Sequence, residues 1–201
     1  MTLDLGTGIA VATLALPVVG GLLPAVAQDW RWILLGVALA EAGAGLLLLR
    51  LWPPFMAVSL LIAGWIAAAF LGLGQSAQWQ RGAPMPEAWA GRLFRFTITG
   101  FALVLLAYQT ENTLAWLPSG FTPEMAWAAL GLMLMGILHL AMTQHPFRVT
   151  ASLLILLAGF VLVYAYIEQS LLLTVLLVGV KLFLGAMGSY LLFAPVTGEG
   201  A

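Results

Sequence analysis

Long apolar segments separated by short polar ones make up nearly the whole chain. A helix needs about 20 apolar residues to cross the hydrocarbon layer of a membrane. By this measure the sequence predicts about seven transmembrane helices, at residues 6–27, 32–51, 54–75, 93–110, 124–143, 147–167 and 170–194. The fourth segment, "RLFRFTITGFALVLLAYQTEN", has the shortest apolar core and ends in polar residues. The pattern therefore predicts an all-α fold, a polytopic transmembrane helix bundle that forms one integral membrane domain over residues 1–201.

Composition supports lipid rather than water as the solvent of this chain. Its residues are 63% hydrophobic and 7% charged, whereas a soluble domain carries about 25% charged residues. The formal net charge is −1 with no basic or acidic tract, so nucleic acid is not expected as a partner. The chain has no cysteine, which excludes disulfides and iron–sulfur ligation. We expect no cofactor, because the sequence also lacks a phosphate-binding glycine loop and metal-ligand spacing.

Tryptophan and arginine positions predict how the chain lies in the membrane. Tryptophans cluster near the predicted helix ends, as in the interfacial belt of membrane proteins. Seven crossings place one arginine, Arg50, on the N-terminal side and five on the other: Arg31, Arg81, Arg92, Arg95 and Arg148. The arginine-rich side should be cytoplasmic, so we expect an inner membrane protein of a bacterium with its N-terminus outside and its C-terminus inside. The N-terminal residues "MTLDLGTGIAV" lack the basic residues of a secretory signal, so the first apolar segment should be retained as a helix. This assignment requires the fourth segment to cross fully.

Two parts of the chain share a weak internal similarity. "WILLG" at 32–36, "PPF" at 53–55 and "SLLIAG" at 59–64 match "WAALG" at 127–131, "HPF" at 145–147 and "SLLILLAG" at 152–159 in order and rough spacing. Two such units of three helices after a first helix would form an inverted repeat, because three crossings reverse direction. The alternative is chance similarity between leucine-rich helices.

Two charged residues lie deep inside predicted membrane spans. Glu41 occurs in "GVALAEAGAGLLLL" and Lys181 in "LVGVKLFLGAMG". A charge at the centre of a transmembrane helix costs about 2.5–3.5 kcal/mol on an insertion scale. Such residues usually face the bundle interior, pair with an opposite charge or line an ion path. We therefore select both as candidates for a proton or ion path. The alternative for Lys181 is a structural pair with a carboxylate of this chain or of a neighbouring subunit, and for Glu41 it is a neutral, hydrogen-bonded side chain that helps to pack helices. The two residues could also form one ion pair with each other.

Histidine supplies one further candidate. His139 lies about one turn from a helix end in "GILHLAMTQHPF" and could transfer protons near neutral pH. The alternative is a histidine that only satisfies a backbone carbonyl. His145 is expected to be a solvated loop residue. The two histidines are six residues apart, which does not suit a bis-histidine haem between different helices.

The last three predicted spans resemble a known family. The segment "LGLMLMGILHLAMTQHPFRVTASLLILLAGFVLVYAYIEQSLLLTVLLVGVKLFLGAMGSYLLF", residues 130–193, is similar to the small K-type membrane subunit of complex I and to component E of hydrogenase-4-type membrane complexes. The resemblance implies a chain of protonatable carboxylates across the membrane. Here Lys181, four residues before Gly185, stands where the family has an acidic residue, and the helix at 148–167 has no carboxylate.

The resemblance and the buried charges favour a non-catalytic integral membrane subunit of a complex I-like, hydrogenase-like or antiporter-like assembly. Its expected partners are antiporter-like membrane chains and lipid. It would contribute to a proton or cation path, or to the scaffold of that path, through Lys181, Glu41 and His139. One alternative is a stand-alone small transporter with inverted repeats. Another is a structural or assembly subunit of a different membrane complex, such as a photosynthetic one.

Overall fold

The computed structural model describes residues 5–79, 89–114 and 122–193. Within this part of the chain there are seven helices and no strand. They are α1 (Leu5–Val26), α2 (Trp30–Leu48), α3 (Pro54–Trp79), α4 (Trp89–Leu114), α5 (Pro123–Ala141), α6 (Pro146–Ile167) and α7 (Leu171–Phe193). The predicted all-α helix bundle is confirmed. The largest difference is in α4, which extends beyond its apolar core at both ends. Arg81 lies outside the described residues, within the stretch 80–88 between the third and fourth helices.

Short capping signals set where several helices begin. The side chain of Asp29 accepts a hydrogen bond from the backbone N–H of Arg31 at 3.1 Å and so caps α2. Thr122 caps α5 by accepting from the backbone N–H of Met125 at 3.4 Å. Helices α3, α5 and α6 each have a proline at their first residue, where the missing N–H would have no helical partner. These residues therefore mark the first turns of α2, α3, α5 and α6.

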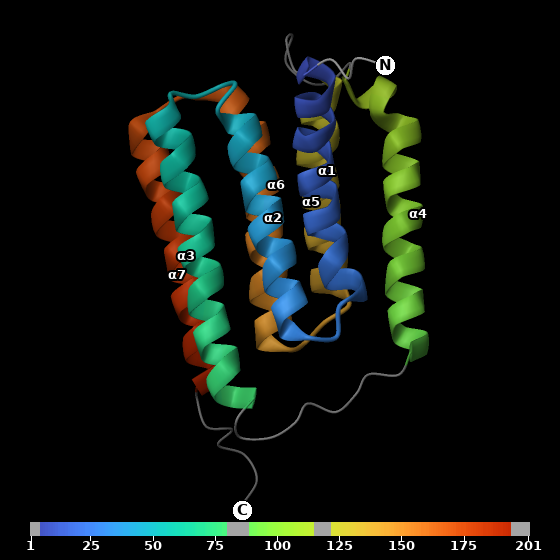
Figure 1. Cartoon of the computed structure of the whole chain (residues 1–201), viewed down its shortest axis with the longest axis vertical. Coiled ribbons are helices and arrows are strands. Elements are labelled where there is room, and N and C mark those ends of the chain that lie inside the picture. The colour runs from blue at the N-terminus through green and yellow to red at the C-terminus, as the bar shows by residue number, and fades with distance from the viewer. Residues whose placement is uncertain (1–4, 80–88, 115–121, 194–201) are drawn as a thin grey trace, which may run out of the picture.

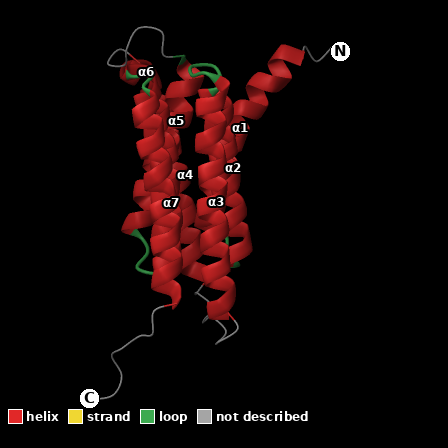
Figure 2. Cartoon of the chain, turned by 90° about the vertical axis from the view of Figure 1, so that its left-hand side faces the viewer, coloured by secondary structure: helices red, strands yellow, loops and turns green. Residues whose placement is uncertain are grey.

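The helices form two layers of three, with α4 at one edge (Figure 1). Helices α1, α2 and α3 make one layer, and α5, α6 and α7 make the other. Across the layers α1 contacts α5, α2 contacts α6 and α3 contacts α7. Helix α4 packs on α5 and α1, at the edge opposite α3 and α7 (Figures 1 and 2). Within each of these cross-layer pairs the two helices run in the same direction, because α4 returns the chain to the end where α1 began.

Matching glycine contacts show that the two layers are built alike. Gly20 in α1 packs against the backbone of α2, and a Cβ there would lie 2.8 Å from the Cα of Ala40. Gly136 in α5 packs in the same way on α6, where a Cβ would lie 2.8 Å from the Cα of Leu156. Both residues of the second contact are 116 positions after those of the first. Close helix approach through a small residue is a common device in membrane bundles.

A second pair of contacts has the same offset. A Cβ on Gly43 of α2 would lie 2.7 Å from the backbone nitrogen of Pro17 in α1. A Cβ on Gly159 of α6 would lie 2.7 Å from the backbone nitrogen of Met133 in α5. Again each residue is 116 positions after its counterpart. The hairpin α1–α2 therefore corresponds to the hairpin α5–α6 in its packing.

This correspondence differs from the repeat expected from the sequence. The similarity of residues 32–76 to residues 127–170 pairs α2 with α5 and α3 with α6, which run in opposite directions. The contacts instead relate α1, α2 and α3 to α5, α6 and α7, as a parallel repeat joined by α4. The motifs "PPF" and "HPF" agree because both begin helices with a proline, a preference shared by unrelated helices. The repeat is therefore identified by the spacing of the close-packing glycines and not by the leucine pattern.

The outer surface of the bundle is apolar, as lipid contact requires. Large hydrophobic side chains are strongly exposed on the outer helices, including Phe101, Val104, Leu172, Val175 and Phe183. Soluble proteins rarely expose such continuous apolar surface. Among the described residues five helices (α2, α3, α5, α6 and α7) are long and apolar enough to span a membrane, while α1 and α4 contain shorter apolar stretches at 14–26 and 93–109. The chain is therefore a membrane-spanning helical bundle.

Polar contacts connect the two layers at both ends of the bundle. At one end the indole nitrogen of Trp52, after α2, donates a buried hydrogen bond of 2.9 Å to the carbonyl oxygen of Ala165 in α6. At the other end the Arg148 guanidinium donates to the carbonyl oxygen of Ala27, at 3.2 Å. Helix-terminal carbonyls without partners would be costly in an apolar environment. The two contacts therefore help to fix the layers in register.

Gly185 gives a test of this packing, with Gly179 on the same helix as its control. A Cβ on Gly185 would lie 2.6 Å from the Cα of Ala67 in α3, whereas nothing lies within 4 Å of a Cβ on Gly179. We expect Gly185→Ala to lower the free energy of unfolding by about 1–3 kcal/mol through overpacking. Gly179→Ala should be neutral or stabilise by up to about 1 kcal/mol through helix propensity. Unfolding in mixed detergent micelles measures both, and equal effects of the two substitutions would contradict the α3–α7 contact.

Candidate functional site

The two charges predicted inside the membrane meet in the structure. Glu41 lies in α2 and Lys181 near the middle of α7, 140 residues apart in sequence. Their side chains are 1% and 2% exposed, and the Lys181 Nζ donates to the Glu41 Oε2 in a buried ion pair. Sequence alone indicated a polar partner for each residue but could not show that they are partners of each other.

Helix α3 lines the space around the pair. A Cβ on Gly64 would lie 2.6 Å from the Glu41 Oε2, so the absence of a side chain at this residue makes room for the carboxylate. The carbonyl oxygen of Leu60, one turn earlier, lies 3.5 Å from the Lys181 Nζ. The pair is therefore held by three helices, α2, α3 and α7.

One oxygen of the carboxylate is not used by this arrangement. The Glu41 Oε1 is buried and has no hydrogen-bond partner among the described residues. An ionised carboxylate accepts several hydrogen bonds when it can, and a buried acceptor without a partner is costly. The Oε1 atom is thus the oxygen of the pair that is left to accept a proton.

The energetics of burial show how far the Glu41–Lys181 pair can stabilise the fold. Taking two opposite charges out of water costs several kcal/mol per ion before their attraction is counted. Replacing a buried pair by well-packed apolar residues is often neutral or stabilising, whereas removing one partner costs about 3–5 kcal/mol. The contact thus prevents a large loss without making the fold more stable than an apolar core would.

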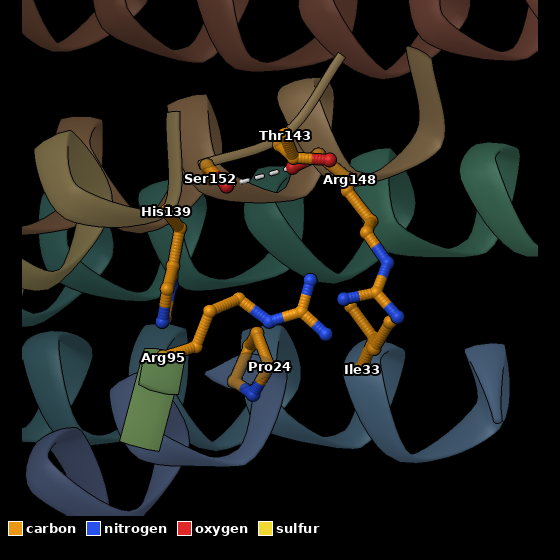
Figure 3. A pocket seen from close by; sticks show the side chains of 7 residues that line it. All are labelled: Pro24, Ile33, Arg95, His139, Thr143, Arg148 and Ser152. Carbon is orange, nitrogen blue, oxygen red and sulfur yellow. Dashed lines mark hydrogen bonds between the residues drawn. The ribbon is translucent and has the colours of Figure 1, made fainter. Parts of the chain in front are cut away.

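His139 does not join this pair. It lies near the C-terminal end of α5, is 5% exposed, and lines a small cavity with arginines from two other helices (Figure 3). Neither ring nitrogen has a hydrogen-bond partner among the described residues. The alternative that its ring satisfies a backbone carbonyl is therefore not realised. The three predicted site residues form two separate places, a charged pair and a histidine cavity.

Two further polar residues have simple structural settings. His145 precedes α6 as its N-cap residue without a side-chain capping bond. Glu168 ends the same helix, and its carboxylate accepts a 3.0 Å hydrogen bond from the Tyr164 hydroxyl. Within the described residues no group of three histidine, cysteine, aspartate or glutamate side chains could hold a metal ion.

Comparison with family models, with curated protein sequences and with solved structures finds no match to this chain. The resemblance of residues 130–193 to complex I-type membrane subunits therefore stays a prediction. What the geometry defines is a class, a helical membrane protein with one buried ion pair and one small cationic cavity in its described part.

Sequence reasoning missed two features of these places. The role of Gly64 is invisible without the packing of α3 on α2. The gathering of Arg95 and Arg148 around His139 had a signal, because all three were expected near the same side of the membrane. In the sequence, these positions indicate only the orientation of the chain in the membrane.

A double-mutant cycle tests the energetic account of the Glu41–Lys181 pair. We expect Lys181→Met or Glu41→Leu alone to lower the free energy of unfolding by about 3–5 kcal/mol, because each leaves a buried charge without its partner. The double substitution should cost less than either single one. The measurement is unfolding of the purified chain in mixed micelles. Additive losses would show that the two side chains do not interact in the membrane-embedded protein.

Proposed function

We propose that this chain is a non-catalytic integral membrane subunit of a complex I-like, hydrogenase-like or antiporter-like assembly. In this proposal the Glu41–Lys181 pair belongs to a proton or cation path that partner chains complete. The chain brings no redox centre of its own to the assembly. Its orientation, with the N-terminus outside and the C-terminus in the cytoplasm, is part of the same proposal.

The observation that carries this proposal is a buried ion pair in a chain with very few charges. Stability alone gives a weak reason for such a pair, since apolar residues could replace it at little cost. Intramembrane ionisable residues mark ion and proton paths in many membrane proteins. A function that needs protonatable groups at this depth explains both side chains together.

In this proposal the pair alternates between two protonation states. When Glu41 is ionised, the Lys181 ammonium donates to its Oε2. When a proton arrives at the Oε1 of Glu41, the carboxyl becomes neutral and attracts the ammonium less. The carbonyl oxygen of Leu60, at 3.5 Å from the Lys181 Nζ, then offers a second acceptor. A short movement of one flexible side chain therefore accompanies each protonation.

Placement at the edge of the bundle favours a subunit over a complete transporter. Lys181 belongs to α7, which with α3 forms the edge opposite α4 (Figure 2). The outer face of α7 is apolar and exposed, for example at Leu172, Val175 and Phe183. A neighbouring membrane chain packed on this face would come close to the buried pair.

The pair also bears on the resemblance to complex I-type subunits. That resemblance implies a carboxylate at the position of Lys181. In this chain α2, outside the resembling segment, brings a carboxylate to the same place. In this proposal the acidic group of the site is therefore contributed by a different helix.

The parallel three-helix repeat supports a second candidate, a stand-alone transporter. Some transporters are built from parallel repeats related by an axis along the membrane normal. Helices α1 to α3 and α5 to α7 have such a relation, with α4 between them. This reading differs from the inverted repeat expected from the sequence and requires a solute path between the layers.

Proton flux into vesicles tests the first proposal. Native membranes that contain the tagged full chain are used, with Lys181→Met, Glu41→Gln and the charge exchange Glu41→Lys with Lys181→Glu. We expect each single substitution to lower driven proton uptake at least about tenfold, the low end for loss of a positioned proton-transfer group. Co-purification of partner chains should remain, and the charge exchange should recover part of the uptake.

Two results would contradict this assignment. If the single substitutions leave proton uptake unchanged while the protein stays assembled, the pair is structural. If the chain purifies without partners and transports a solute in liposomes by itself, the stand-alone transporter is correct.

A further inference from the structure

The cavity beside His139 is unused by the proposed ion path. It lies where α1 and α5 end and where α2, α4 and α6 begin (Figures 1 and 3). Its polar lining consists of Arg95, His139, Thr143, Arg148 and Ser152. Pro24 and Ile33 close its apolar side. Five helices and one connection thus converge on one cationic cavity near an end of the bundle.

Two guanidinium groups face each other across this cavity. Figure 3 shows the side chains of Arg95, from α4, and Arg148, from α6, extending toward one another. One Arg148 nitrogen donates to the carbonyl oxygen of Ala27 at 3.2 Å, which fixes the direction of this side chain. None of the described residues that line the cavity is acidic. Two like charges brought together in this way favour an anion between them.

The buried histidine is the second, independent observation. His139 is 5% exposed, and neither of its ring nitrogens has a hydrogen-bond partner among the described residues. A buried polar group in this state usually meets a ligand or an ordered water. The cavity volume is about 10 Å³, which is room for roughly one water-sized group. A ligand would therefore insert a single oxygen atom and leave the rest of its group at the mouth.

We propose that Arg95, His139 and Arg148 form a binding site for a phosphate group. One phosphate oxygen enters the cavity and accepts a hydrogen bond from His139, while both guanidiniums contact the oxygens at the mouth. The phosphodiester of an anionic lipid and free inorganic phosphate share this chemistry. Basic pockets between membrane helices are known to bind lipid headgroups. Such a ligand would connect the edge helix α4 to α6 and thereby hold α4 against the two layers.

Lipid binding by the full-length protein tests this site. The protein is purified in detergent, titrated with phosphatidylglycerol or phosphatidylcholine, and analysed by native mass spectrometry. We expect selective phosphatidylglycerol adducts, weakened at least about tenfold by Arg95→Gln, since one charge-assisted contact is lost. Arg148→Gln should have a similar effect. Arg50→Gln is the matched control, because it removes an arginine from the opposite end of the bundle and should leave binding unchanged.

Competition identifies the source of the phosphate group. Inorganic phosphate that displaces the lipid, or binds by calorimetry in an Arg95-dependent way, indicates a free phosphate site. Lipid binding that resists inorganic phosphate indicates a headgroup site. Either result supports the proposal if the Arg95 and Arg50 variants differ as expected.

Other outcomes would overturn it. Equal binding of the two lipids without Arg95-dependent binding of inorganic phosphate, or equal effects of Arg95→Gln and Arg50→Gln, would mean that only water occupies the cavity. If Arg148→Gln fails to fold, because Arg148 also bonds the end of α1, then Arg95→Gln decides alone. His139→Leu gives a second check, since it removes the buried donor while keeping both guanidiniums, and it should weaken the binding of phosphatidylglycerol.

Discussion

The absence of water from the hydrocarbon layer is the constraint on which the rest of this structure depends. A polar group there must find its partner inside the protein. Nearly all of the chain meets this requirement because its side chains are apolar and its backbone is helical. Glu41 and Lys181 meet it by pairing with each other. For that contact to exist, three helices must lie in fixed positions. The pair thus requires the α2–α3–α7 packing, and the close approach of α7 to α3 at Gly185 brings the lysine to the carboxylate.

Small residues make this packing possible on both sides of the bundle. Gly20 and Gly136 let the first two helices of each layer approach at equivalent points. In the third helices the equivalence is lost, since α7 carries a lysine and the carboxylate that meets it comes from α2, in the other layer. The parallel repeat therefore provides a symmetric frame, and the ion pair breaks the symmetry at one place.

Helix number, helix bounds and the buried state of both charges followed from the sequence, because apolar length and the cost of burying charge depend on local composition. The sequence did not reveal that Glu41 and Lys181 are partners of each other. Glu41 and Lys181 are far apart in the chain, and their contact depends on the order of helices in space, which hydropathy does not encode. The repeat was misassigned for a related reason. Leucine content and proline starts are shared by all membrane helices, whereas the informative contacts at Gly43 and Gly159 appear only when helices are packed together.

The two polar places in the described part of the bundle differ in electrostatic character, and this separates their chemistry. The Glu41–Lys181 pair is neutral as a whole, and adding or removing one proton would leave a single buried charge without its partner. The cavity at Arg95, His139 and Arg148 is lined by two fixed positive charges, because arginine stays protonated in proteins. A proton entering that cavity would be repelled, and an anion would be retained. The cavity is therefore a poor continuation of a proton path from the pair, and under the phosphate-site proposal His139 would donate to a bound oxyanion.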